Sequence, residues 1–259
     1  YALSEIAYQT AVAFAQERRQ MRALNPERRD HSQAADCILV HPDIRRLLAG
    51  IRSTNEGMRA LGAFVAGQLD IAQHDPDEKK REVADDIVQL LTPVVKAFCT
   101  ERGFANISDA MQVCGGAGYT RDWPIEQYMR DQRIAMIYEG TNHIQALDLV
   151  GRKLPRHGGR LVRRFAALVT ETIRSCGDDE RLADLVDGLK TASKALTTAT
   201  MELAQKGMKD PEEAGAVATP YLNLFGLTAL ALMWVEMAKA SVDREGKFYE
   251  TKVKMARFY

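Results

Sequence analysis

The sequence predicts an all-α protein, a helical bundle followed by a second, smaller helical domain. Apolar residues recur at three- and four-residue spacing along almost the whole chain, which is the pattern of amphipathic helices. No stretch gives a convincing strand pattern. The chain has 259 residues, of which 46% are hydrophobic and 27% charged, so it can bury a sizeable core.

The first helices can be placed in order from their breakers and apolar stripes. The opening helix is expected over residues 3–21, ending before a polar stretch in which Pro26 biases Asn25 away from helical geometry. Pro42 suits the first turn of the next helix, where a missing amide proton costs little. That helix carries apolar residues at helical spacing to residue 65, and another such stripe covers residues 83–98.

A glycine-rich break and a loop follow these helices. The run over residues 114–119 interrupts the helical pattern, because its glycines permit positive φ and close backbone approach. A short helix around Ile125 then leads to a loop over residues 138–142. The next helix runs to Val150, with Thr141 or Asn142 as its N-cap, and Gln145 could close a capping box with Asn142.

A domain boundary is predicted where proline, paired glycines and charge gather over residues 153–160. The bundle is therefore assigned to residues 1–154 and the appended helical domain to residues 155–259. Further helices are expected over residues 161–175 and 181–206 and from Pro211 or Pro220 to residue 242, followed by a polar tail. Residues 221–237 are almost continuously apolar but fall short of the ~18 residues typical of a membrane-spanning helix, so a buried helix and no membrane span are expected.

Charge and cysteine content exclude several classes of partner. Thirty-five basic residues balance thirty-five acidic ones without a block of like charge, so nucleic acid is not an expected partner. The four cysteines form no C-x-x-C pair, which argues against a zinc site or a disulfide scaffold and favours a cytoplasmic location. The opening residues do not form a signal peptide, and the absence of a starting methionine indicates a fragment.

Three motifs lie in order within one stretch of the chain. They are Q-x-x-G-G-x-G-Y over residues 112–119, P-x-E-x-x-x-R-D over residues 124–131 and I-Y-E-G-T-x-x-I-Q over residues 137–145. Together they resemble the acyl-CoA dehydrogenase family in both order and spacing. The tail over residues 247–259 resembles the longer bacterial branch of that family, which includes fatty-acyl and 3-methylmercaptopropionyl-CoA dehydrogenases.

The resemblance implies α,β-dehydrogenation of acyl-CoA thioesters to 2-enoyl-CoA with FAD as cofactor. Glu139 occupies the position of the family's base, which takes the α-proton while a hydride leaves the β-carbon. Tyr138 and Gly140 are expected beside the substrate, and the Glu139 amide is expected to donate to the thioester carbonyl as an oxyanion hole does. A closed apolar pocket would raise the pKa of the Glu139 carboxyl toward that of a working general base.

The resemblance also implies seven cofactor-binding positions. Arg18 matches an arginine that reaches the FAD diphosphate, although its neighbour Arg19 could be the true match. Thr141 is expected to contact the flavin, and His143 either lies beside the dinucleotide or lines the helix surface. The remaining positions lie at the end of the first helix and in the glycine run: Met21, Gln112, Gly115 and Gly116.

Further implications concern the complete enzyme and its partners. The resemblance implies a complete enzyme with an amino-terminal helical domain, a middle β domain and a carboxy-terminal helical bundle. This chain is therefore expected to lack much of the flavin and substrate site and to be inactive alone. The family shares FAD across a subunit interface, which implies a homodimer or homotetramer, and electron-transfer flavoprotein is the expected acceptor in fatty-acid β-oxidation. Two alternatives stay open: an acyl-CoA oxidase, which lets oxygen reach the reduced flavin, and a non-catalytic helical scaffold of the same fold.

Overall fold

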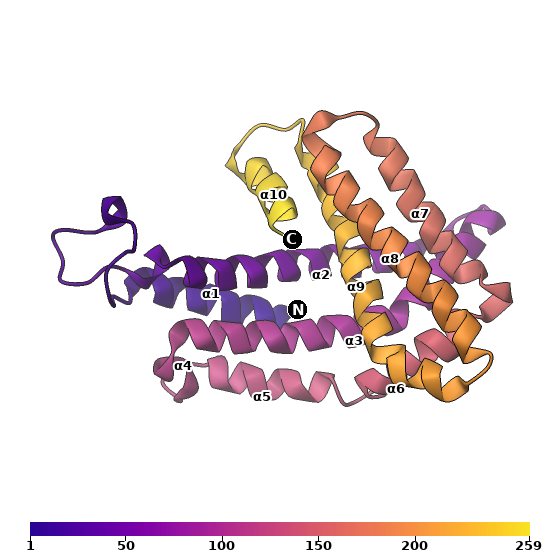
Figure 1. Ribbon diagram of the computed structural model, residues 1–259, viewed down its shortest axis with the longest axis horizontal. Helices are drawn as coiled ribbons and strands as arrows, with labels where there is room; N and C mark the ends of the chain where they lie inside the picture. Colours follow the sequence, from indigo (N-terminus) through magenta and orange to yellow (C-terminus); the bar gives the residue numbers. More distant parts are fainter. The chain divides into compact units, whose positions relative to one another are not determined.

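A computed structural model describes all 259 residues as ten α-helices joined by turns and loops, of which the connection over residues 18–41 is the longest (Figure 1). The all-α prediction is confirmed, since the nearest approach to a strand is one isolated antiparallel bridge between Arg19 and Cys37. The helices are α1 (Ala2–Glu17), α2 (Pro42–His74), α3 (Glu78–Cys114), α4 (Gly116–Tyr119), α5 (Ile125–Ala135), α6 (Asn142–Asp148), α7 (Arg160–Cys176), α8 (Ala183–Gly207), α9 (Pro211–Ser241) and α10 (Lys247–Phe258). The shorter turns are η1 (Pro26–Arg28), η2 (Ile38–Val40), the π-helical η3 (Leu149–Lys153), η4 (Arg156–Gly158) and η5 (Glu180–Leu182).

The chain divides into two compact units. The first unit consists of Tyr1–Glu56 and Thr100–Ala135, and the second of Gly57–Cys99 and Met136–Tyr259. Helices α2 and α3 contribute residues to both. These two compact units are not the two domains predicted from the sequence, and the boundary between residues 154 and 155 stays a prediction.

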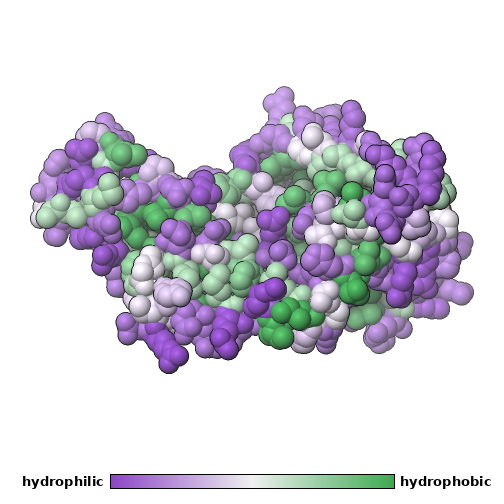
Figure 2. Space-filling model, turned by 60° about the horizontal axis from the view of Figure 1, so that its bottom comes forward, coloured by the Kyte–Doolittle hydropathy of each residue, from purple (hydrophilic) through white to green (hydrophobic).

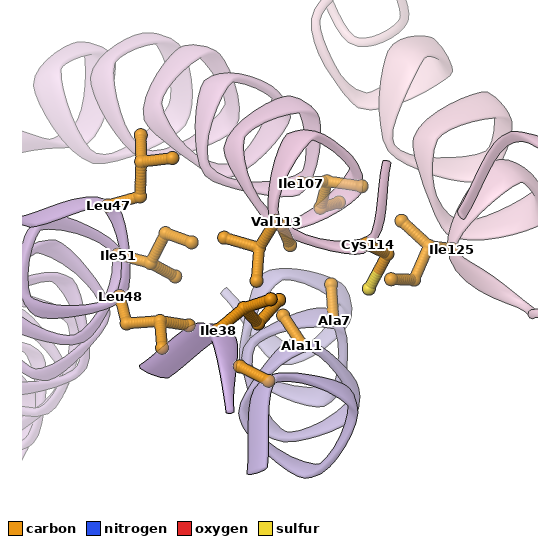
Figure 3. Close-up of a cluster of buried hydrophobic side chains, with 12 residues drawn as sticks. Ala7, Ala11, Ile38, Leu47, Leu48, Ile51, Ile107, Val113, Cys114 and Ile125 are labelled. Carbon is orange, nitrogen blue, oxygen red and sulfur yellow. The ribbon is translucent and has the colours of Figure 1, made fainter. Parts of the chain in front are cut away.

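The core of the first unit is built from four helices and one turn. Helix α1 buries a stripe of small residues at three- and four-residue spacing, among them Ala7 and Ala11, because such positions share one face of a helix. Figure 3 shows these alanines facing Ile38 of η2 and the larger side chains of α2 and α3. Ile125 at the start of α5 completes the cluster and is fully buried. This packing fixes the end of α1 next to the end of α3, where the predicted cofactor residues lie.

The second unit is organised around α9, which contacts α6, α7, α8 and α10 (Figure 1). Tyr221, Phe225 and Trp234 of α9 are buried, and the Phe225 ring packs against Phe165 of α7 with centroids 4.7 Å apart. Helix α9 has the length and apolar composition of a membrane-crossing helix. However, 56% of its most apolar window is buried within the chain, and the core helix of a globular fold has the same composition.

A buried carboxylate joins α3 to α7 inside the second unit. Asp86 is 2% exposed and receives a two-point hydrogen bond from Arg160, at 2.8 and 3.0 Å. Arg164 adds a third bond at 3.1 Å. A carboxylate buried this deeply needs such pairing, because an unpaired buried charge is strongly destabilising. The start of α7 is thereby tied to α3.

Three local expectations are corrected by the structure. Helix α1 ends at Glu17 rather than Met21, because the chain turns extended at Arg18, with φ −66° and ψ 125°, to pair with residues 36–38. The predicted polar tail contains helix α10, which buries Met255 and Ala256. Gln145 does not close a capping box; Thr141 alone caps α6 by accepting from the Ile144 amide at 3.4 Å.

Candidate active site

A hollow in the first unit brings together five of the seven predicted cofactor residues. It has a volume of about 480 Å³ and lies between the end of α1, the start of α2 and the end of α3. We call it the cofactor hollow. Its lining includes Arg18, Met21, Gln112, Gly115 and Gly116. Residues almost a hundred positions apart in the sequence therefore share one surface, although their binding role stays a prediction.

The two candidate arginines at the end of α1 differ in their partners. Arg19 is committed to the protein, because its guanidinium donates to Asp30 at 3.1 Å and to the Ala35 carbonyl at 3.2 Å. Arg18 lines the cofactor hollow, is exposed and has no ion pair or side-chain hydrogen bond within the chain. Of the two, Arg18 is the guanidinium free to meet an anion.

Met21 owes its position at the hollow to an unusual backbone. It is 71% exposed and has φ +61°, a conformation that non-glycine residues adopt at a cost. Backbone hydrogen bonds hold it there, because the Asp36 amide donates to the Met21 carbonyl and the Gln20 amide donates to the Asp36 carbonyl, both at 2.9 Å. We call residues 18–21 the strip. His41, the residue directly before α2, also contacts it, because His41 Nε2 lies 2.9 Å from the Gln20 carbonyl.

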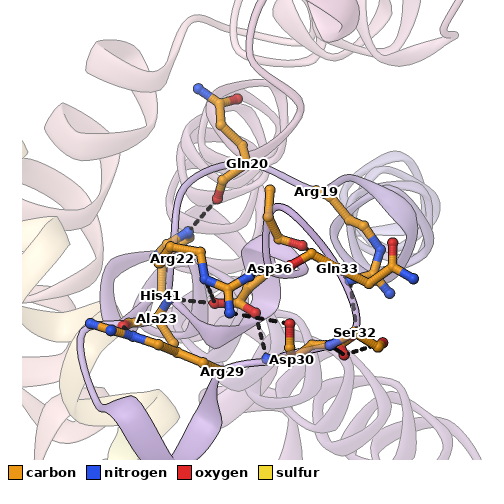
Figure 4. Close-up of polar contacts among 11 residues, drawn as sticks. Arg19, Gln20, Arg22, Ala23, Arg29, Asp30, Ser32, Gln33, Asp36 and His41 are labelled. Carbon is orange, nitrogen blue, oxygen red and sulfur yellow. Dashed lines mark hydrogen bonds and ion pairs between the residues drawn. The ribbon is translucent and has the colours of Figure 1, made fainter.

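Asp36 organises the loop behind this strip (Figure 4). Its carboxylate is 1% exposed and accepts from the amides of Ala23 at 2.7 Å and Asp30 at 2.6 Å. Those bonds, led by the one from Ala23, together with the nearby Arg22 guanidinium, lower the pKa of the Asp36 carboxyl. Arg22 also donates to the Gln33 carbonyl at 2.6 Å. The loop over residues 22–35 therefore depends on one buried charge.

The glycine turn at the end of α3 leaves open space beside the hollow. Gly115 has φ +58°, and a Cβ added at Gly115 or Gly116 would meet no atom within 4 Å. Gly118 differs, because its Cβ would lie 2.8 Å from that of Cys114. Cys114 is buried as a small filler, and burial raises the pKa of its thiol to about 11. The turn thus packs tightly on one side and is open on the side of the hollow.

The predicted base lies on a loop of the second unit, residues 138–142, which we call the glutamate loop. Glu139 has φ +56° and Gly140 φ +83°, so two consecutive residues are left-handed. The Glu139 side chain is exposed, and Tyr138 beside it is 54% exposed. The chain by itself therefore does not provide the closed apolar pocket expected around Glu139. Figure 2 shows how hydrophobic side chains reach the surface in several places among hydrophilic ones.

Helix α3 holds the glutamate loop through Lys96, a residue that the sequence motifs do not single out. Lys96 donates to the Gly140 carbonyl at 2.5 Å and to Asn142 Oδ1 at 3.1 Å, and Asn142 Nδ2 donates to the Ala97 carbonyl at 3.2 Å. From α6, Gln145 Nε2 donates to the Glu139 carbonyl at 3.0 Å. One signal could have identified Lys96: it is a lysine within the apolar run of residues 93–98, where a charge needs a partner.

The other two predicted cofactor residues lie on the glutamate loop and α6, in the second unit. Thr141 is exposed at the start of α6, and its hydroxyl accepts the capping bond. His143 is exposed in the first turn of that helix. Neither side chain is held in the interior of the chain.

Two sequence profiles match the chain. The profile of "Acyl-CoA dehydrogenase, C-terminal domain" matches residues 2–154, and that of "Acetyl-CoA dehydrogenase C-terminal like" matches residues 165–259. A 3-methylmercaptopropionyl-CoA dehydrogenase of Ruegeria pomeroyi is 37% identical over the full chain, which covers 44% of that relative. A broad-specificity linear acyl-CoA dehydrogenase of Mycobacterium tuberculosis is 32% identical over 85% of the chain, covering 38% of that relative. The chain thus spans less than half the length of these relatives.

Solved structures share the fold at lower sequence identity. Caenorhabditis elegans ACDH-11 in complex with C11-CoA superposes with a TM-score of 0.77 at 17% identity, over 98% of this chain and 40% of its own. An acyl-CoA dehydrogenase complexed with FAD from Bacillus anthracis gives 0.72 at 18% identity, over 98% of this chain and 42% of its own. A tomato acyl-CoA oxidase gives 0.74 at 14% identity, over 98% of this chain and 40% of its own. By its profile match and its relatives, this chain belongs to the acyl-CoA dehydrogenase family, of which it carries the C-terminal helical domain.

Proposed function

We propose that this chain forms the C-terminal helical part of an FAD-dependent acyl-CoA dehydrogenase in which Glu139 removes the α-proton. One observation carries the proposal: the I-Y-E-G-T-x-x-I-Q element folds into a left-handed loop that offers an exposed carboxylate and an unused backbone amide at the same residue. The Glu139 N–H donates to no group of the chain. An acid and a free donor on one residue suit a reaction in which a proton leaves and an oxygen gains charge.

In the proposed reaction, Glu139 accepts the α-proton of the thioester while a hydride leaves the β-carbon. The electrons of the α-carbon–hydrogen bond form the new double bond, which gives a 2-enoyl thioester. As charge grows on the thioester oxygen, the fixed Glu139 amide stabilises it at little reorganisation cost. The positive φ of Gly140 turns the following chain into α6.

The cofactor hollow fits one part of FAD. An unpaired guanidinium at Arg18 suits a diphosphate, and the open space beside Gly115 and Gly116 allows a ligand to approach the backbone. Thr141 and His143 are proposed to serve the flavin end. When bound, FAD supplies the hydride acceptor; the chain supplies binding, orientation and the proton acceptor. The FAD in the related Bacillus anthracis structure supports this assignment.

The remaining length of the longer enzyme is proposed to cover the glutamate loop. Glu139 is exposed here, so exclusion of water from its carboxylate requires residues beyond this chain. We therefore expect the isolated chain to lack dehydrogenase activity. A flavin reduction assay on the purified 259-residue chain tests this, and turnover would contradict it.

The subunits are proposed to form a homodimer or homotetramer that shares FAD, with electron-transfer flavoprotein as acceptor. This part of the proposal rests on the resemblance to the family, whose members share FAD across a subunit interface. Sedimentation of the FAD-loaded enzyme would distinguish the two oligomers, and a monomer that retains FAD would contradict both.

The proposed base is tested in the full-length protein with Glu139→Gln. The amide is similar in shape but cannot accept the proton, so exchange of the α-hydrogen with D₂O should fall by at least ~10³-fold while bound FAD is kept. Glu245→Gln serves as control, because Glu245 is exposed and lies outside the loop. Exchange that survives Glu139→Gln at the control rate would assign the base elsewhere.

A second candidate, acyl-CoA oxidase, is favoured by the shared fold of the tomato enzyme. The two activities differ in what reoxidises the flavin. Oxygen uptake measured beside reduction of electron-transfer flavoprotein separates them. Rapid oxygen uptake would establish the oxidase.

A further inference from the structure

Helix α3 holds the glutamate loop at two residues: Gly140, the second of its left-handed pair, and Asn142. The Lys96 ammonium bridges the Gly140 carbonyl and Asn142 Oδ1, and Asn142 in turn donates to the Ala97 carbonyl. These three bonds connect positions 44 to 46 residues apart in the sequence. The loop is further closed by the Asn142 amide, which donates to the Met136 carbonyl at 3.1 Å.

These contacts are needed because the backbone conformation of the loop is unfavourable for its residues. Glu139 is a non-glycine residue at φ +56°, a region that L-residues avoid because Cβ approaches the backbone. Strained residues of this kind persist only where surrounding contacts hold them. The Glu139 carbonyl is held by Gln145, and the next carbonyl, that of Gly140, is held by Lys96. Successive peptide groups are thus fixed from two different helices.

Lys96 is also electrically coupled to the base. Burial lowers the pKa of its ammonium, while the charge of Glu139 acts in the opposite direction. Bonds from an ammonium to carbonyl and amide oxygens are stronger than those of a neutral donor. Lys96 therefore ties the loop at a point where a neutral side chain of the same length would hold it less firmly.

We propose that Lys96 is a positioning residue for the dehydrogenation, holding the 139–142 backbone so that the Glu139 carboxylate and amide meet the substrate in register. This inference rests on the proposed function and adds to it a residue of α3. Lys96 itself does not exchange protons with the substrate. Its removal should thus impair the chemical step more than substrate or cofactor binding.

The test compares Lys96→Met with Lys96→Arg in the full-length FAD-loaded enzyme. The substrate is the straight-chain saturated acyl-CoA that the parental enzyme turns over fastest. Loss of charge-assisted hydrogen bonds should lower kcat by about 10- to 100-fold in Lys96→Met, with KM and bound FAD changed less than about threefold. Lys96→Arg keeps a cationic donor and should retain at least about a tenth of parental kcat.

Lys153→Met is the matched control, since Lys153 is also largely buried in the second unit but pairs with Asp148 at 3.8 Å. Its kcat should stay within about twofold of parental. Should Lys96→Met fail to accumulate with FAD, Asn142→Ala removes the other bonding side chain and should give the same selective loss of kcat. A kcat within threefold of parental in the FAD-loaded variant tested would overturn the proposal, as would an equal loss in Lys96→Arg and Lys96→Met.

Failure of this inference can be told apart from failure of the proposed function. If Glu139→Gln abolishes α-proton exchange while Lys96→Met does not slow it, the base is right and the positioning role is wrong. If Glu139→Gln leaves exchange intact, the base assignment itself fails, and with it the positioning role for which Lys96 was invoked.

Discussion

The glycine turn after α3 and the glutamate loop before α6 both depend on positive φ, but they are held in different ways. The turn has its left-handed residue at Gly115 and closes on itself, with Gly115 donating to Gln112 and Gly118 to Gly115 at 3.2 and 3.1 Å. The loop has a left-handed Glu139, and its bonds come from Lys96 on a distant part of the chain. Local sequence is sufficient for the turn, whereas the loop needs the tertiary fold. A short sequence motif can therefore specify the backbone of the glycine turn, but it cannot by itself specify the orientation of the strained Glu139.

The largest effect should come from crowding the turn. In Gly118→Ala the new Cβ meets the Cys114 Cβ at 2.8 Å and the Met111 carbonyl at 3.2 Å, neither of which is a flexible chain end. We expect a loss of about 1–3 kcal/mol in unfolding free energy. Urea denaturation of the full-length protein measures it. An unchanged midpoint would mean that the turn is looser than described.

A substitution in the glutamate loop should lower stability somewhat less than Gly118→Ala does, but it should slow flavin reduction more. Gly140→Ala places a side chain at φ +83°, which costs about 1–2 kcal/mol for an L-residue. The loop should relax away from Lys96, so flavin reduction should slow while substrate affinity changes little. Gly151→Ala is the control, because its Cβ meets nothing within 4 Å. Equal rates in the two variants would show that the loop tolerates displacement.

The loop over residues 22–35, behind the cofactor hollow, should respond to acid. The pKa of Asp36 is lowered in the folded protein, so its contribution is present above the ordinary carboxyl pKa of about 3.9 and is lost as the pH falls through the lower folded value. The Ala23 and Asp30 amides donate to Asp36, so their protection against hydrogen exchange should fall as the pH drops through the folded pKa of Asp36. Asp36→Asn should show the faster exchange at neutral pH. Protection that is indifferent to both changes would remove Asp36 as the organiser of this loop.

The smallest structural effect should come from Gly116→Ala. Its Cβ would meet nothing within 4 Å and would project into open space beside the hollow, so stability should change by less than about 0.5 kcal/mol. If FAD approaches this backbone, its Kd should rise by about three- to tenfold. Titration of the apo-enzyme with FAD gives the value. An unchanged Kd would place the cofactor away from the turn.

Local features of the fold could be predicted from the sequence, whereas features that depend on tertiary contacts could not. The helical class could be predicted because apolar spacing is a local property. The glycine break at residues 114–119 is present as the end of α3 and the one-turn α4. The end of α1 was misjudged by four residues, because pairing with residues 36–38 pulls Arg18 out of the helix. Helix α10 was missed because its amphipathic face, with Met255 and Ala256, is short and lies among many charges.

The candidate site divides in the same way. Glu139, Arg18 and the glycine turn could be identified from motifs, but the choice of Arg18 over Arg19 required the bonds that occupy Arg19. The apolar run around Lys96 could have marked it as a charge that needs a partner, but no sequence pattern indicates that the partner is a loop 44 residues later. The role of Asp36 was not predicted for a related reason: its partners lie on the other side of a loop whose conformation the sequence does not indicate.

By itself the sequence determined the helical periodicity, the family and the residues able to carry the chemistry, since each of these depends on residue type and spacing. Only the tertiary structure decided which charges are already paired, which backbone groups are free and what holds Glu139 in a conformation that it would not adopt alone. Those features depend on contacts between distant segments, and such contacts form only when the helices pack.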